Sequence, residues 1–208
     1  MTITTRSGKG SALTWAEEDS NFVELDARTT EGWQMLVGEI STDGLSNPPS
    51  KVLYKGIVQL DSFDPDNIQE LAVVFHIPKD YVAGSDFYPH GHFHSSTTSA
   101  GTVRWGFSLT WANPYHLADF GREPFTEEKF VSPVTGYVEA TLDASHQDAN
   151  NVAESVVPFS IPYLLPGAII FMRVFRDATH INDTYPGSIF MTSVALAYRS
   201  QGFGGTEV

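Results

Sequence analysis

The sequence predicts an all-β protein, an antiparallel double-sheet jelly-roll sandwich preceded by an extended N-terminal arm and one short helix. Three observations favour this class. Short runs with alternating apolar residues recur along the chain. Clusters of Gly, Pro, Asn and Asp separate these runs. Strand patterns do not alternate with helix patterns, as they would in a protein with a parallel sheet. An immunoglobulin-like sandwich is the second architecture to consider.

The composition limits the classes of function. The chain has 208 residues, which fits one β domain, and it has no cysteine. Twelve basic against twenty-five acidic residues give a net charge of −13, so we expect no nucleic-acid partner. The chain begins without a signal-peptide pattern and contains no long apolar run, so we expect no membrane partner either.

The first part of the chain, residues 1–30, is expected to form a basic arm and a short helix, and residues 31–208 the sandwich domain. Arg6 and Lys9 precede the first acidic residue, which is Glu17. Thr14 and Glu17 have the spacing of a capping box, and the helix that follows carries an apolar stripe. The arm either docks on another protein or is a solvated terminus. If it docks, we expect contacts from Arg6, Lys9, Leu13, Trp15 and Phe22.

Strands are predicted in order along the sandwich domain. Pro48 and Pro49 interrupt the pattern after the first strand. A turn is expected at 133–136, a long loop at 112–126, and a second polar loop at 145–155. The predicted strands are 33–40, 51–63, 70–77, 87–94, 103–111, 129–134, 136–144, 156–164, 168–176 and 188–200.

The central stretch, residues 84–111, contains two strands joined by a turn of small residues. Side chains two apart on a strand share a face, so His90, His92 and His94 should line one face and Phe93 the other. Trp105 belongs to the returning strand. We favour a structural role for these five residues, in the core or at an oligomer interface. His90 and His92, about 7 Å apart along the strand, are weak candidates for a metal pair.

Two groups of residues match segments of known proteins. The first, in residues 6–25, resembles a segment found near the start of many tailed-phage fibre and other virion proteins, and rests on Leu13, Thr14, Glu17, Asp19, Asn21, Phe22 and Leu25. The second, across roughly residues 70–205, is similar to a family of phage structural proteins. It rests on Gly84, Ser85, Pro89, His90, His92, Phe93, Gly101, Val103, Trp105, Arg173, Arg176, Asp183, Thr184, Tyr185 and Gly187.

The resemblances imply a β-sandwich component of the virion. We expect a capsid decoration or cement protein on the outer head surface that binds the major capsid protein or another virion protein and forms a homotrimer. A short tail or head fibre or adaptor is the alternative in the same class. We expect no enzymatic activity and no cofactor.

A cupin-like metal enzyme or a carbohydrate-binding module is the alternative of another class. Gly84, His90 and His92 fit the start of the first cupin motif, but Ser96 and Thr97 stand where its glutamate is needed. His180 and Asp183 lie in a turn pattern, and Arg173 and Arg176 should face opposite sides of their strand.

Overall fold

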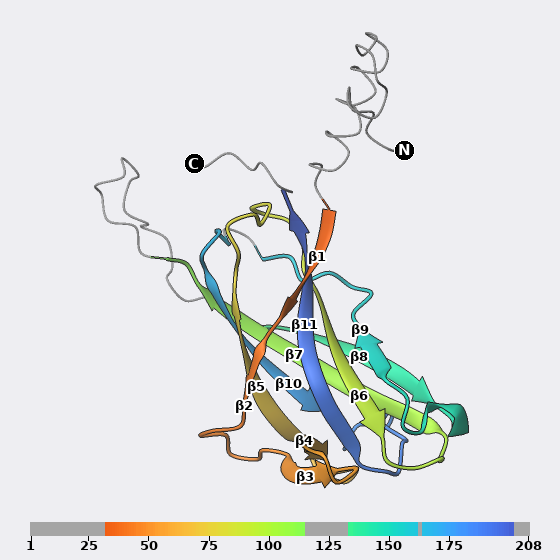
Figure 1. Ribbon diagram of the computed structural model, residues 1–208. Helices are drawn as coiled ribbons and strands as arrows, with labels where there is room; N and C mark the ends of the chain where they lie inside the picture. The colour runs from red at the N-terminus through yellow and green to blue at the C-terminus, as the bar shows by residue number, and fades with distance from the viewer. Residues whose placement is uncertain (1–31, 115–132, 162–163, 202–208) are drawn as a thin grey trace, which may run out of the picture.

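A computed structural model describes residues 32–114, 133–161 and 164–201 of the chain. They form two antiparallel sheets packed face to face (Figure 1). Sheet A has the order β3 (Ser50–Tyr54), β4 (Val58–Phe63), β11 (Ile189–Ser200), β6 (Tyr88–Ser95) and β9 (Asn151–Glu154), with β1 (Gly32–Val37) beside β11. Sheet B has the order β2 (Glu39–Ser41), β5 (Gln69–His76), β10 (Ile169–Arg176), β7 (Gly101–Ala112) and β8 (Val134–Leu142).

The strand order is that of a jelly roll. The strands β4 to β11 form two four-stranded units, β4-β11-β6-β9 in sheet A and β5-β10-β7-β8 in sheet B. Because the chain repeatedly changes sheet, β6 and β7 do not pair with each other although a short turn joins them. The predicted all-β double-sheet fold is therefore confirmed, with β1, β2 and β3 added to the eight-strand body.

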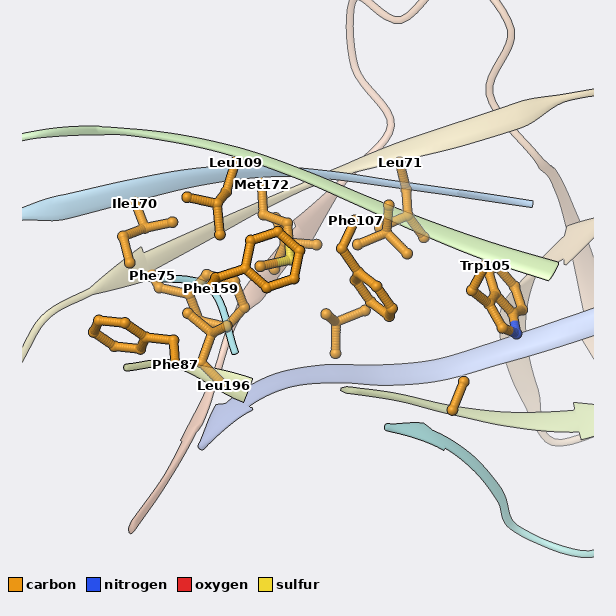
Figure 2. Close-up of a cluster of buried hydrophobic side chains, with 14 of the residues drawn as sticks. Leu71, Phe75, Phe87, Trp105, Phe107, Leu109, Phe159, Ile170, Met172 and Leu196 are labelled. Carbon is orange, nitrogen blue, oxygen red and sulfur yellow. The ribbon is translucent and has the colours of Figure 1, made fainter. Parts of the chain in front are cut away.

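The core lies between the inner faces of the two sheets. Trp105 on β7 is fully buried and packs edge-on against Phe63, with ring centres 5.0 Å apart, and against Phe93 at 5.6 Å. Figure 2 shows Phe107 of β7 and Leu196 of β11 pointing into the same space from opposite sheets. Phe93 and Trp105 thus lie in the core, as the alternation of residues predicted.

The strand predicted at 33–40 is split by Gly38, where the chain passes from sheet A to sheet B. The Gly38 amide donates to the Val194 carbonyl at 2.9 Å. A Cβ at Gly38 would lie 2.2 Å from Val73 Cγ1, so no other residue fits without displacement. The prediction of one continuous strand was wrong. The break depends on side chains from another strand that pack against Gly38, and such a contact does not change the alternation of apolar residues in the sequence.

The strand predicted at 51–63 is a hairpin of β3 and β4. Lys55 and Gly56 have φ angles of 52° and 71°, and the Ile57 amide donates to the Tyr54 carbonyl at 3.1 Å. Positive φ at both positions is typical of tight hairpin turns. The alternation of apolar residues continues across this turn. The pattern therefore predicted one strand where the structure has two.

Three further predictions differ from the structure. The turn expected at 133–136 is wrong because β8 already begins at Val134. The polar segment 145–155 contains β9 and the end of a short 3₁₀ helix, Ala144–His146. In the described part of 156–164, only an isolated bridge between Phe159 and Phe87 occurs in place of the predicted strand.

Other predictions fall on residues outside the described part. These are the arm and helix of residues 1–30, most of the loop at 112–126, and most of the strand at 129–134. In the residues that are described, no helix is long and apolar enough to cross a membrane.

Arg176 holds the connection from β10 to β11. Its guanidinium is fully buried and makes two bonds to the Asp183 carboxylate, at 2.7 and 3.0 Å. It also donates to the carbonyls of Tyr185 and Gly187, at 2.5 and 2.8 Å. The backbone amide of Arg104 donates to the same carboxylate at 3.0 Å. Arg176, Asp183, Tyr185 and Gly187, which carry part of the resemblance to phage structural proteins, therefore have a structural role here.

Candidate functional site

The histidines of β6 lie on the outer face of sheet A, as predicted. Pro89, Gly91 and Phe93 turn inward, and Phe93 is completely buried. The alternate residues Tyr88, His90, His92 and His94 therefore share the outward side of the strand. Because β6 lies between β11 and β9, its outward side chains occupy the middle of this face.

His90 is the most enclosed of these side chains, with only 2% of its surface exposed. Neither of its ring nitrogens makes a hydrogen bond. Burial lowers the pKa of His90, because the charged imidazolium loses its hydration. The residues level with it on the neighbouring strands are Ala195 and Glu154, and Val37 lies beyond Ala195. A neutral imidazole is therefore enclosed at the centre of the face.

The other two histidines have partners. His92 Nδ1 lies 3.2 Å from the side-chain amide nitrogen of Asn150. The ring of His94 stacks on Tyr54, with centres 5.2 Å apart and planes inclined by 22°. The Tyr54 hydroxyl in turn donates to Asp148 at 2.9 Å, and Lys55 donates to the same carboxylate at 2.7 Å. These contacts connect the β3–β4 hairpin to the histidine row.

The arrangement of His90 and His92 bears on the predicted metal pair. Their rings are nearly perpendicular, with centres 5.3 Å apart. Within residues 32–114, 133–161 and 164–201, no group of three or more His, Asp or Glu side chains is placed to hold a metal ion. No third ligand from the described residues therefore joins this pair.

Strand β1 adds a row of exposed apolar side chains to the same face. Trp33, Met35 and Val37 are 49%, 56% and 66% exposed, while Leu36 turns inward against the core. The ring of Trp33 contacts Tyr88 edge-on at 5.2 Å, and the Arg199 guanidinium lies 5.6 Å from the centre of the Trp33 ring. The face is therefore continuous from β1 across β11 to β6.

The sequence reasoning missed the contribution of β1. The segment 33–40 was predicted only as a strand, without a functional role. A usable signal was present, because apolar side chains occupy consecutive positions from Met35 to Val37. A strand that is apolar on both sides buries one side in the core and leaves the other for a contact.

Further apolar side chains extend the face toward both edges of sheet A. Val152 on β9 and Val58 on β4 are about half exposed. The charged side chains that the described strands place on this face are Arg199 and Glu154. The outer face of sheet A therefore combines aromatic, aliphatic and imidazole groups with little charge, which is typical of a protein contact surface.

Other predicted site residues lie elsewhere. The arm residues Arg6, Lys9, Leu13, Trp15 and Phe22 fall outside the described residues. Arg173 and Arg176 face opposite sides of β10 as expected, since Arg173 is exposed and paired with Glu70 whereas Arg176 is buried.

Comparison with known proteins adds little to this description. No family model and no curated protein sequence matches the chain. Among solved structures, it is similar to dimeric latent PorU from Porphyromonas gingivalis, with 9% identity over 86% of this chain and a TM-score of 0.36. It is also similar to the enzymatically active domain of tailspike protein 4 of bacteriophage CBA120, with 7% identity over 83% of this chain and a TM-score of 0.30.

A third similar structure is TmCBM61 in complex with beta-1,4-galactotriose, with 10% identity over 83% of this chain and 92% of that chain, and a TM-score of 0.29. The chain spans only 14% of PorU and 20% of the tailspike domain. At this level of similarity, none of the three carries an argument about the function of this chain.

Proposed function

We propose that this chain is a structural protein of a bacteriophage virion, and that it acts as a decoration protein on the outer surface of the head. The observation that carries the proposal is the outer face of sheet A, where Trp33, Met35 and Val37 are exposed side by side. Contiguous exposed apolar surface of this kind is typical of sites that bind other proteins. A structural protein of a virion needs such a site.

The sequence supports a location on the outside of the virion head. The segment around Leu13, Thr14 and Glu17 resembles the start of phage fibre and other virion proteins. A net charge of −13 favours the outside of the head, because packaged DNA would repel an acidic body from the inside. The basic residues Arg6 and Lys9 then provide the attachment, through an acidic surface of the major capsid protein or another virion protein.

The test is binding of the purified protein to heads of the encoding phage that were assembled without it. The intact chain should sediment with these heads, and a variant lacking residues 1–13 should not, while its circular dichroism remains that of a β protein. Arg6→Glu and Lys9→Glu should each weaken binding, whereas Lys79→Glu, the same charge change on the body, should not.

Two outcomes would overturn the proposal. Binding to purified tails and not to heads would favour the fibre or adaptor alternative. Absence of binding to either, together with binding to a neutral polysaccharide, would favour a carbohydrate-binding module.

A further inference from the structure

We propose that the outer face of sheet A is the surface through which copies of this chain associate with one another. The self-association face consists of Trp33, Met35, Val37, Tyr88, His90 and His92. The inference goes beyond the proposed function, because it assigns this face to a second copy of the chain and leaves attachment to the head to the N-terminal arm. It can be tested in solution with no virion present.

The charge of the chain limits where a second copy can make contact. Two copies that each carry −13 repel each other, so a stable contact needs surfaces with little negative charge. The strand residues level with His90 on β11 and β1 are Ala195 and Val37, and Glu154 at the β9 edge is the acidic group in this row. Along this row, a contact therefore brings one acidic side chain of each copy, Glu154, to the interface.

The size of the face fits a stable contact between proteins. Sheet A is five strands wide, with β1 and β4 sharing one side of β11. A spacing of about 4.8 Å between strands and about 3.3 Å per residue gives a face of roughly 25 by 25 Å, or about 600 Å². Stable interfaces bury roughly 600–1,000 Å² on each partner, so a contact that covers the whole outer face of sheet A reaches the lower end of this range.

His90 suggests that the association depends on pH. It lies at the centre of the face with two ring nitrogens that lack partners. The titratable groups facing it are His92, with its ring centre 5.3 Å away on the same strand, and Glu154 on β9. A second copy would remove the remaining water, so only the neutral imidazole is compatible with the contact. Association should therefore weaken as the pH falls through the pKa of His90 in the free folded chain, which burial already holds below its ordinary value.

The experiment measures the mass of the full-length protein by sedimentation velocity across a range of concentrations. We expect the wild-type chain to form a closed dimer, because a face that meets the same face of a second copy is closed by a twofold axis. The trimer expected from the sequence would need a second contact patch. Val37→Asp should weaken association by about 100-fold or more. Phe171→Asp is the matched control, because Phe171 is 47% exposed on the outer face of sheet B, and it should leave the mass unchanged.

Thermal unfolding verifies that each variant is folded, and Met35→Lys replaces Val37→Asp if that variant does not fold. A wild-type chain that remains monomeric at roughly 100 μM would overturn the proposal. So would a folded Val37→Asp or Met35→Lys variant with the wild-type mass, or a loss of mass in Phe171→Asp alone. Binding to heads is measured separately, so failure of self-association can be distinguished from failure of the virion assignment.

The dependence on pH is measured on the same samples. Between about pH 8 and about pH 5, association of the wild-type chain should weaken, with the decline confined to the acidic end because burial already lowers the pKa of His90 in the free chain. His90→Gln should associate to the same degree at both pH values. An equal weakening in His90→Gln and in the wild type would show that His90 does not cause the dependence of association on pH.

Discussion

The exposed side chains on the two outer faces of the sandwich make different kinds of contact. On sheet B, Arg104 makes ion pairs with Glu139 at 2.7 Å and Asp177 at 3.2 Å, and its guanidinium lies 4.2 Å from the centre of the Tyr137 ring. On sheet A, by contrast, the central His90 has no hydrogen-bond partner, and Trp33 and Met35 are about half exposed.

The difference shows how one fold can present two kinds of surface. On sheet B, the two arginines Arg104 and Arg173 lie over aromatic rings and pair with acidic side chains, while Phe171 remains about half exposed. On sheet A, apolar side chains stand beside groups that are almost all uncharged. A face of this kind gains free energy when another protein covers it.

The largest expected effect is on association, from Trp33→Ala. Removing this aromatic side chain should weaken association by about 2–4 kcal/mol, because tryptophan is among the residues that most often dominate the energy of an interface. Tyr137→Ala is the control, since Tyr137 is 48% exposed on sheet B and Trp33 is 49% exposed on sheet A. Sedimentation equilibrium of both variants measures the difference, and equal effects would remove the distinction between the faces.

A loss of folding stability is expected from Gly106→Val on sheet B. A Cβ at Gly106 would lie 2.1 Å from the Phe175 ring, which closes over this position. The ring must move, and we expect a loss of about 1–3 kcal/mol in the free energy of unfolding, measured by urea denaturation. In Gly91→Ala the new methyl group meets only the flexible end of Met191, at 3.3 Å, so its loss should be smaller. The reverse order would contradict this packing.

The stability of the monomer should also depend on His90. Burial lowers the pKa of His90 in the folded state, so the unfolded chain binds more protons once the pH falls below about 6.5. Stability is therefore fully present above that pH and falls by at most about 1.4 kcal/mol per pH unit below it. Urea unfolding of Val37→Asp, with and without His90→Gln, measures this loss. If it persists in the double variant, another group is responsible.

The smallest effect is expected from Arg173→Ala on sheet B. Arg173 is about half exposed, pairs with Glu70, and lies 4.4 Å from the centre of the Phe175 ring. Exposed ion pairs contribute at most about 1 kcal/mol, so the midpoint of urea unfolding should shift slightly and the mass not at all. A change in mass would show that sheet B also takes part in association.

Residue patterns predicted the features that arise from alternation. The inward turn of Phe93, the outward turn of the histidines, and the opposite directions of Arg173 and Arg176 all follow from the two-residue period of a strand. The jelly roll was favoured because many such strands are separated by turns.

Features that depend on tertiary contact were not predicted. Gly38 marks a change of sheet because Val73 and Phe75 occupy the space next to it, and those residues are distant in sequence. The positive φ angle of Lys55 is also unusual for a residue that is not glycine. The burial of His90 depends on its neighbours across the sheet, and its own strand carries no sign of it.

The central claim, that the outer face of sheet A is covered by a second copy, is tested most directly by oxidation of Met35. Mild peroxide oxidises exposed methionine to its sulfoxide, and peptide mass spectrometry reports each methionine separately. Met172 and Met191, both about 2% exposed in the core, are the internal references. We predict that Met35 is protected in the assembled wild-type chain and oxidised rapidly in Val37→Asp. Rapid and equal oxidation of Met35 in both proteins would contradict the account.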